Sequence, residues 1–213
     1  MKIFRYNKKM SIITKIKRHQ AALKKCTQCP DMTGPAVAGN PVASPIMLIG
    51  QAPGDKEIII PKPFAWTAGK TLFKWFNQLG VDEELFRQQV YMTAVCRCFP
   101  GKKPRGGDRV PNLTEIKTCS RWLNAEIDLL QPKLIIPVGK LAISQYIKLT
   151  KLTDVIGQVH KVKLNGVEVE IIPLPHPSGA STWHITEPGK TLLQQALNLV
   201  KNHPVWKAHF NKI

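Results

Sequence analysis

Short runs of apolar residues alternate along this chain with longer segments in which apolar residues recur at helical spacing. The short runs predict four buried strands, at residues 46–49, 90–95, 133–138 and 169–174. The longer segments predict helices at residues 11–25, 69–79, 113–130, 140–148 and 190–201. Because strands and helices alternate, the pattern predicts a single-domain three-layer α/β/α fold with a central four-stranded parallel sheet.

Each predicted strand is followed by a loop rich in glycine or proline, at residues 50–54, 98–101, 139–140 and 175–179. Ligands of an open α/β sheet bind outside the carboxyl ends of its strands, so we expect these four loops to border one crevice. A further turn is predicted at Asn165-Gly166, a dipeptide that is typical of tight hairpins.

The charge balance narrows the class of ligand. The chain has 213 residues, with 31 Lys and Arg against 14 Asp and Glu and a net charge of +17. An excess of this size creates a field that attracts polyanions, and nucleic acid is the first interpretation. A basic surface that serves solubility and an anionic membrane surface are the alternatives. No apolar run approaches the ~18–20 residues that are needed to span a bilayer.

The basic residues are concentrated near the N-terminus, where residues 1–30 carry nine Lys or Arg and no acidic residue. We expect residues 1–25 to form a basic N-terminal helix or extension and residues 26–213 to form the main domain. A transit peptide has a similar composition, but Cys26 and Cys29 follow at once and are expected to belong to the folded protein. No secretory segment is apparent, so the expected compartment is cytoplasmic, and no protein partner is inferred.

Five cysteines are present, and an odd number in a chain of this length disfavours a disulfide framework. Cys26 and Cys29 form a C-x-x-C pair, while Cys98 and Cys119 lie far downstream. Four thiolates can hold a 4Fe–4S cluster or a structural zinc ion, and the lack of a second tight pair favours iron–sulfur. Cys96 and Cys98 share one side of a strand, so alternation leaves open which of them is a ligand. Buried free cysteines are the alternative.

Two loops carry candidate chemistry beyond the cysteines. Residues 50–55 form a glycine-rich turn of the kind that cradles phosphate or another ligand, and a simple strand-to-helix turn has the same composition. His176 follows a buried strand and precedes proline, so it is held in a fixed loop. There it could donate a hydrogen bond to a carbonyl that gains charge; a structural histidine is the alternative.

The loop at residues 99–112 combines cations with glycine and proline. This composition predicts a loop that contacts phosphates, and a solvated surface loop is the alternative. Its candidate DNA-binding residues are Lys102, Lys103, Arg105 and Arg109.

These segments together resemble the uracil-DNA glycosylase superfamily, most closely its iron–sulfur families 4 and 5, over residues 26–200. The order and spacing of the matches make the resemblance specific. The matching segments are Gly50-Gln-Ala-Pro-Gly54, Lys62-Pro-Phe64 with Ala68-Gly69, residues 90–100, Cys119, residues 131–139 and His176-Pro-Ser178. The resemblance implies a glycosylase-like domain at residues 26–213, whose partner is DNA containing uracil or another damaged base. Such a protein would be associated with the nucleoid.

The resemblance also assigns roles to the cysteines. It implies that a structural 4Fe–4S cluster is held by Cys26, Cys29, Cys98 and Cys119. Cys96 is then spare. The cluster would tie the basic N-terminal helix to the helix that contains Cys119.

The implied activity is that of a monofunctional DNA glycosylase in base excision repair, which flips a nucleotide out of the stack and hydrolyses its N-glycosidic bond. Phe64 would stack on the flipped base. His176 would donate a hydrogen bond to uracil O2 as negative charge develops there. Backbone N–H groups of Gln51 and Ala52 would bind the base, beside Ser178 of the second motif.

The chain departs from these families at several positions of the site. Gln51 stands where family 4 has Glu, Ala52 where family 1 has the Asp that orients water, and Ala94 where an Asn reads the uracil edge. Without the Asn side-chain amide at position 94, we expect either a relaxed specificity for the base or a loss of activity. Asp55 and Glu57 are the nearest remaining carboxylates and are the candidates for a catalytic one.

Two tryptophans are expected to lie near the site. Trp183 is the apolar candidate for a wedge that opens the duplex from the minor groove, with packing against the core as the alternative. Trp66 stands where glycine is usual in the family and is expected to narrow the pocket.

The alternative functions are a catalytically silent iron–sulfur protein that binds nucleic acid, and a glycosylase for another deaminated base such as hypoxanthine or xanthine.

Overall fold

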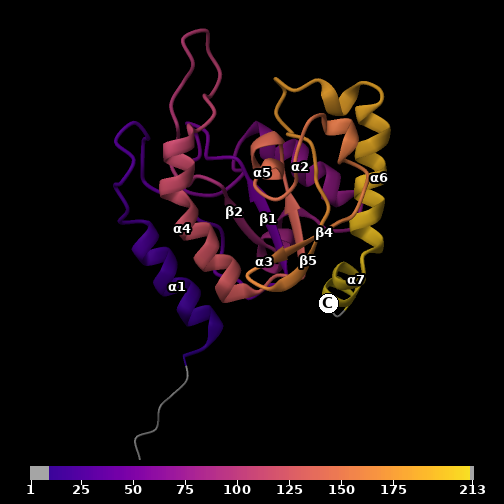
Figure 1. The fold of residues 1–213 in the computed structure, drawn as a ribbon, viewed down its shortest axis with the longest axis horizontal. Coiled ribbons are helices and arrows are strands. Elements are labelled where there is room, and N and C mark those ends of the chain that lie inside the picture. The colour runs from indigo at the N-terminus through magenta and orange to yellow at the C-terminus, as the bar shows by residue number, and fades with distance from the viewer. Residues whose placement is uncertain (1–9, 212–213) are drawn as a thin grey trace, which may run out of the picture.

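The computed structural model describes residues 10–211 and shows one sheet of five strands in the order β2-β1-β3-β5-β4 (Figure 1). The strand bounds are Ile46–Gly50 (β1), Tyr91–Ala94 (β2), Leu134–Pro137 (β3), His160–Leu164 (β4) and Val167–Ile171 (β5). β1, β2, β3 and β5 are parallel, as predicted, and β4 pairs with β5 in the antiparallel sense. The prediction of a four-stranded sheet was therefore one strand short.

The fifth strand, β4, is one arm of the hairpin predicted around Asn165-Gly166, and it forms one edge of the sheet. Its side chains alternate between half-buried and exposed, with Lys161 and Lys163 facing solvent. It therefore lacks the continuous apolar run that marks a strand buried on both faces. The hairpin predicted at Asn165-Gly166 joins β4 to β5, and these two residues have φ values of 49° and 82°, as a tight two-residue turn requires.

Helices cover both faces of the sheet, which confirms the three-layer arrangement (Figure 1). Consecutive side chains of β1 point to opposite faces. Ile46 and Leu48 pack in one hydrophobic core with α2, α3, α6 and α7, whereas Met47 and Ile49 pack in the other with α1 and α4. The helix bounds are Ile12–Leu23 (α1), Thr67–Asn77 (α2), Glu83–Gln89 (α3), Leu113–Leu130 (α4), Lys140–Ser144 (α5), Gly189–Asn202 (α6) and Pro204–Phe210 (α7).

The helix α4 has the predicted bounds because a capping box fixes its start. The Asn112 side chain accepts from the Glu115 N–H, and the Glu115 carboxylate accepts from the Asn112 N–H. The helix predicted at residues 140–148 ends earlier, at Ser144. α3 and α7 were not predicted, because each has only seven residues, too few to display a helical period.

The basic helix α1 packs on α4 and contributes to one of the two cores. Ile16 and Leu23 are fully buried, and His19 lies 3.3 Å from Glu126 of α4. Residues 1–9 of the expected N-terminal extension lie outside the described residues. Within residues 10–211, none of the helices combines the length and apolarity that crossing a membrane would demand.

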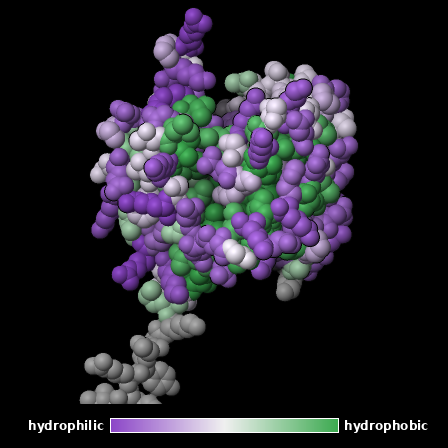
Figure 2. Space-filling model, in the orientation of Figure 1, coloured by the Kyte–Doolittle hydropathy of each residue, from purple (hydrophilic) through white to green (hydrophobic). Residues whose placement is uncertain are grey.

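A basic hairpin, defined here as residues 101–109, projects from the body of the protein after β2 (Figure 1). It is closed by an antiparallel bridge between Lys102 and Asp108. In the space-filling view its tip is hydrophilic, while apolar residues come to the surface in the hollow beside it (Figure 2).

Candidate active site

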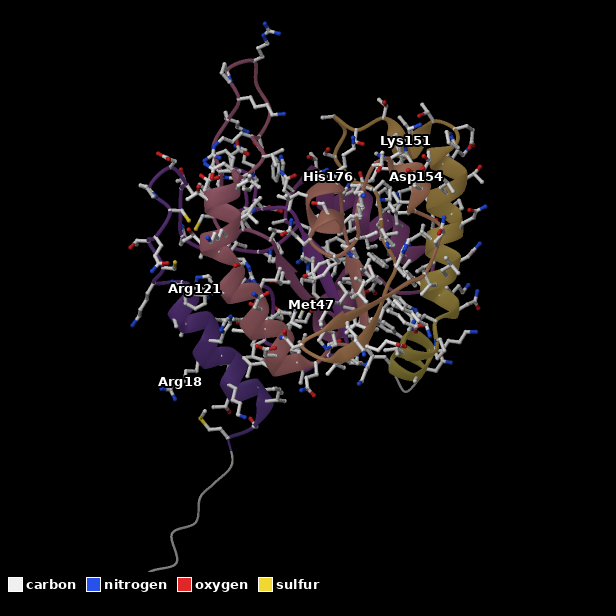
Figure 3. The ribbon with its side chains drawn as sticks, in the orientation of Figure 1. Arg18, Met47, Arg121, Lys151, Asp154 and His176 are labelled. Atoms are coloured by element: carbon white, nitrogen blue, oxygen red, sulfur yellow. The ribbon has the colours of Figure 1, made fainter. Side chains whose placement is uncertain are left out.

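A cavity of about 730 Å³ opens at the carboxyl ends of β1 and β2, where the loop pattern predicted a ligand site. The loops after both strands, residues 63–68, the basic hairpin and residues 176–180 border it. All the residues predicted to bind or act on a substrate line this cavity: Gln51, Ala52, Asp55, Glu57, Phe64, Ala94, His176 and Ser178. Figure 3 shows His176 at this end of the sheet.

His176 is held as a neutral hydrogen-bond donor. The Ser178 N–H donates to its Nδ1 over 3.2 Å, and Ser178 Oγ lies 2.9 Å from the same atom. Because Nδ1 accepts, the neutral ring carries its proton on Nε2. Burial, with a contribution from His184, lowers the pKa of His176 below its usual 6.5. The ring packs on Gly139, where an added Cβ would come within 3.0 Å of it, so the loop after β3 supports the site from behind.

Phe64 forms a fixed aromatic wall of the cavity. Its ring lies against Gly50, where an added Cβ would come within 3.0 Å, and its carbonyl leaves no room for a side chain at Gly69. The φ of Phe64 is 54°, a left-handed conformation that costs a residue with a side chain of order 1–3 kcal/mol. The half-buried ring is therefore held in place, as stacking on a planar base requires.

The two predicted carboxylates have different surroundings. Glu57 accepts hydrogen bonds from the Gly54 and Ala65 N–H groups, over 2.9 and 3.0 Å, and burial raises its pKa. Both of its oxygens therefore hold backbone groups. Asp55 lies 3.1 Å from Lys102 Nζ, and the hydrogen bond from this lysine lowers the pKa of Asp55 and keeps it ionised.

The predicted DNA-binding cations of the basic hairpin fall into two groups. Lys102 bridges Asp55 and Asp108, with the second carboxylate 2.7 Å away. Lys103 and Arg105 are exposed, and neither forms an ion pair with another part of the described chain. These two cations are the ones available to external phosphates.

Arg109, the fourth of these cations, fastens the base of the basic hairpin. Its guanidinium donates to Glu115 of α4 over 2.7 Å and to the Asp31 carbonyl over 3.0 Å. Because Glu115 also caps α4, the basic hairpin is anchored to the start of that helix.

Trp183 packs inward in the segment that follows His176. Its ring lies against Gly189, where an added Cβ would be 2.7 Å away, and it borders the core shared by α2 and α6. This placement matches the packing alternative to a DNA wedge. Ile185 in the same segment is 64% exposed. Trp66 lines the cavity and is about half exposed.

The cysteines gather at a second cavity, of about 320 Å³, where α1 ends beside α4. The cysteines that line it are Cys26, Cys29, Cys98 and Cys119. Burial, reinforced by the neighbouring thiols, raises the pKa of Cys98 to about 11. Cys96 is fully buried outside the lining, and its hydrogen bond lowers the pKa of Cys119. Strand alternation alone did not distinguish Cys96 from Cys98 as a candidate ligand. The cavity distinguishes them, because Cys98 lines it and Cys96 does not.

This second cavity combines four thiols with buried hydrogen-bond donors. Within residues 10–211, no three His, Cys, Asp or Glu side chains converge as ligands of one metal ion. Arg97 borders the cavity at 1% exposure, and its Nε and Nη1 lack hydrogen-bond partners among the described residues. Buried donors of this kind match an anionic, sulfur-rich group. On the outer side, Arg121 Nη2 lies 3.7 Å from Cys26 Sγ (Figure 3).

Arg97 also connects the two cavities. Its remaining nitrogen donates to Glu126, and Glu126 accepts a hydrogen bond from Thr93 Oγ1 over 2.8 Å. Thr93 lines the larger cavity. A buried polar link therefore runs from the cysteines to the wall of the candidate active site.

An α/β/α fold with a large cavity at its strand ends, an aromatic wall and a cationic hairpin suits an enzyme that acts on a nucleotide flipped out of nucleic acid. Residues 37–201 match the model of the family described as the uracil DNA glycosylase superfamily. The chain belongs to this superfamily.

Relatives within the superfamily confirm the resemblance to families 4 and 5. The chain is 30% identical to the Type-4 uracil-DNA glycosylase of Sulfurisphaera tokodaii over 178 residues, which cover 80% of this chain and 76% of the relative. It is 31% identical to the Type-4 uracil-DNA glycosylase of Pyrobaculum aerophilum over 164 residues, 73% of this chain and 79% of the relative. The Type-5 uracil-DNA glycosylase of the same organism is 28% identical over 120 residues, 52% of this chain and 50% of the relative.

Proposed function

We propose that this protein is a monofunctional DNA glycosylase that flips uracil out of DNA and hydrolyses its N-glycosidic bond, leaving an abasic site. One observation carries the proposal: a neutral His176 with an Nε2–H donor and a fixed Phe64 ring line the same cavity. A flipped uracil needs an aromatic surface to replace its stack, and its departing anion needs a hydrogen-bond donor. The names of the relatives support the same activity.

In the proposed mechanism, the flipped uracil stacks on Phe64. When the bond between uracil N1 and the sugar C1′ breaks, the bonding electrons stay on the base and the negative charge spreads to O2. His176 Nε2–H donates to O2, while backbone N–H groups of Gln51 and Ala52 bind the base. Water adds to C1′ and loses a proton, and the proposed acceptor of that proton is Asp55, a carboxylate that lines the cavity.

A second candidate function is the removal of other deaminated bases, and Ala94 favours it. A methyl group lines the cavity at this position, so no side-chain amide from it reads the hydrogen-bonding edge of the base. A cavity of about 730 Å³ also leaves room for a purine such as hypoxanthine or xanthine.

A lesion panel tests both functions in one experiment. Single-turnover reactions would use labelled oligonucleotides that each carry one uracil, hypoxanthine or xanthine, followed by hot alkali to break abasic sites. We expect cleavage at uracil, and cleavage at a purine lesion would add the second function. If no lesion were cleaved while binding stayed tight and salt-sensitive, the protein would be a catalytically silent DNA-binding protein.

Lys103 and Arg105 are proposed to contact DNA phosphates. The double variant Lys103→Ala/Arg105→Ala should bind duplex DNA more weakly at low salt. Its plot of log affinity against log salt should be shallower by roughly 1.8, since each lost phosphate contact removes about 0.9 from the slope. The matched control is Lys161→Ala/Lys163→Ala on the edge strand β4, which removes the same charge elsewhere. Equal slopes for the wild type and the hairpin variant would contradict the assignment.

We also propose that Cys26, Cys29, Cys98 and Cys119 hold a 4Fe–4S cluster. When bound, the cluster would act as a structural cross-link between the end of α1, the loop after β2 and α4. The protein's own contribution is the set of four thiols around one cavity and the unpaired donors of Arg97 at its wall. A structural zinc ion is the alternative, since four thiolates can also hold zinc.

A further inference from the structure

The backbone around Phe64 is strained and needs external support. Its φ of 54° lies in the left-handed region, which residues with side chains rarely adopt unless the surroundings impose it. The packing against Gly50 and Gly69 leaves room for this conformation, and hydrogen bonds to the peptide would hold it there. The polar groups that bind the peptide units on either side of Phe64 therefore matter, because these groups can fix the position of its ring.

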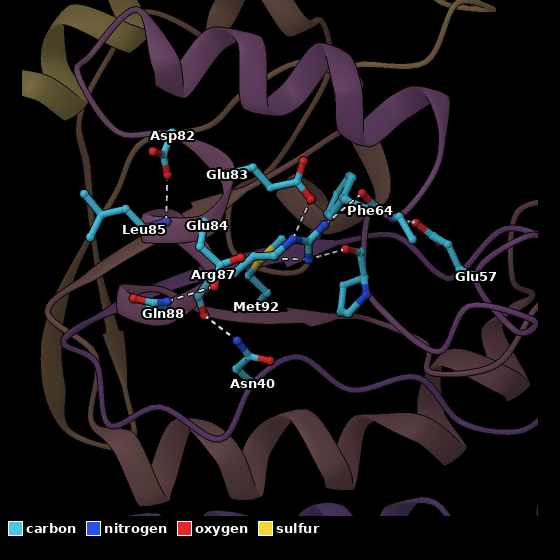
Figure 4. Close-up of polar contacts among 12 residues, drawn as sticks. Asn40, Glu57, Phe64, Asp82, Glu83, Glu84, Leu85, Arg87, Gln88 and Met92 are labelled. Atoms are coloured by element: carbon cyan, nitrogen blue, oxygen red, sulfur yellow. Dashed lines mark hydrogen bonds and ion pairs between the residues drawn. The ribbon is translucent and has the colours of Figure 1, made fainter.

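Arg87 supplies such groups from one side (Figure 4). It lies on α3, only 4% exposed, and it donates to the Pro63 carbonyl over 2.8 Å and to the Phe64 carbonyl over 3.1 Å. Its own position is fixed by a 2.8 Å hydrogen bond to Glu83 and by the Phe73 ring, whose centre lies 4.5 Å from the guanidinium carbon. A planar guanidinium can bind two neighbouring carbonyls at once, which a lysine ammonium cannot match.

Glu57 supplies the complementary groups from the other side. One carboxylate oxygen accepts from the Ala65 N–H over 3.0 Å, and the other accepts from the Gly54 N–H over 2.9 Å. The peptide unit between Phe64 and Ala65 is therefore bound at its carbonyl by Arg87 and at its N–H by Glu57. Through Gly54, the same carboxylate ties this peptide to the loop after β1.

We propose that Arg87 and Glu57 are positioning residues that clamp the Phe64 peptide and hold its ring ready for the flipped base before DNA arrives. Arg87 lies on the helix that leads into β2, and its Nη1 lies 3.8 Å from Met92 Sδ in that strand. The clamp thus joins the stacking ring to the strand whose Thr93 and Ala94 line the cavity. Glu57, one of the two candidate catalytic carboxylates, acts in this proposal through Phe64 rather than on the substrate. The inference rests on the proposed function only for the identity of the stacked base.

The test combines kinetics with hydrogen exchange on the full-length protein. The variants are Arg87→Gln and Arg87→Lys, each alone and combined with Phe64→Ala. Glu84→Gln is the matched control, because Glu84 lies on the same helix, pairs with Gln88 at the surface and does not contact the clamp (Figure 4). Single-turnover uracil excision gives the rate constant at saturating enzyme separately from the half-saturating concentration, and exchange is followed at the Ala65 N–H.

We expect Arg87→Gln to lower the single-turnover rate constant by roughly 10–100-fold, the penalty of a misplaced binding group. Arg87→Lys should give an intermediate rate, and Glu84→Gln should match the wild type. In the Phe64→Ala background, Arg87→Gln should have little further effect, because the ring through which it acts is gone. The Ala65 N–H should lose protection in Arg87→Gln and keep it in Glu84→Gln.

Two outcomes would overturn the clamp. The first is an equal loss of rate from Arg87→Gln with and without Phe64, which would mean that Arg87 merely stabilises the fold. The second is unchanged protection of the Ala65 N–H in Arg87→Gln. If wild-type protein cleaved no uracil, the proposed function would fail, and the exchange measurement would still decide whether the clamp exists.

Discussion

Replacing His176 by Ala should lower the single-turnover rate of uracil excision by about 10²–10³-fold, the cost of removing one donor to a developing anion. DNA binding should be nearly unchanged, because the donor acts on charge that appears only as the glycosidic bond breaks. The measurement is the single-turnover rate beside the affinity for an uncleavable oligonucleotide. His184→Gln is the control, since it removes the neighbouring imidazole but keeps His176 and Ser178.

The pH dependence gives a second check on His176. Its pKa is lowered from 6.5 by burial, so the neutral form persists as pH falls through 6.5. Protonation at lower pH places a proton on Nδ1, which can then no longer accept from the Ser178 N–H. The rate governed by His176 should therefore be flat through pH 6.5 and decline only below it. A near-wild-type rate in His176→Ala would remove His176 from the mechanism, and a decline centred above pH 6.5 would contradict the neutral donor.

Replacing Cys119 by Ala should abolish stoichiometric iron and the brown visible absorbance, because three thiolates then remain in a cavity lined by four. The variant should also melt at a lower temperature, since binding of a structural metal group contributes directly to folding. The measurements are iron and zinc analysis, visible absorbance and thermal unfolding of protein prepared without air.

Cys96→Ala is the matched control for the cluster. This cysteine is buried beside Cys119 but does not line the cavity, so its replacement should leave the iron content intact. Filling its place with a smaller side chain should cost about 1 kcal/mol of unfolding free energy. Loss of iron in Cys96→Ala, retention of iron in Cys119→Ala, or stoichiometric zinc in the wild type would each contradict the proposed ligand set.

The three-layer fold and the location of the candidate active site were predictable, because both follow from patterns within short stretches of sequence. Strands β1 and β3 are apolar on both faces, and α4 carries both an amphipathic pattern and a capping box. Loops at the carboxyl ends of such strands fall on one edge of the sheet by topology alone. Gln51 and His176 could therefore be placed at one cavity from the loop pattern, whereas Phe64 was placed there by the family resemblance.

Features that depend on contacts between distant residues were not predictable. The sequence predicted Arg109 as a cation free to contact DNA, whereas in the structure it donates hydrogen bonds to Glu115 and to the Asp31 carbonyl. Arg87 lies on a helix too short to be recognised, and its partners Pro63 and Phe64 precede it by more than 20 residues. No local spacing shows which groups such a side chain meets after folding.

The buried pair of Arg97 and Glu126 restricts how this protein can diverge. Both side chains are about 1% exposed. Removing one partner of such a pair leaves an unpaired buried charge, which lowers the free energy of unfolding by about 3–5 kcal/mol. That is a large share of the 5–15 kcal/mol that holds a typical domain together. Descendants of this sequence should therefore exchange the two residues jointly or keep both, and Thr93, which donates to the same carboxylate, should be inherited along with them.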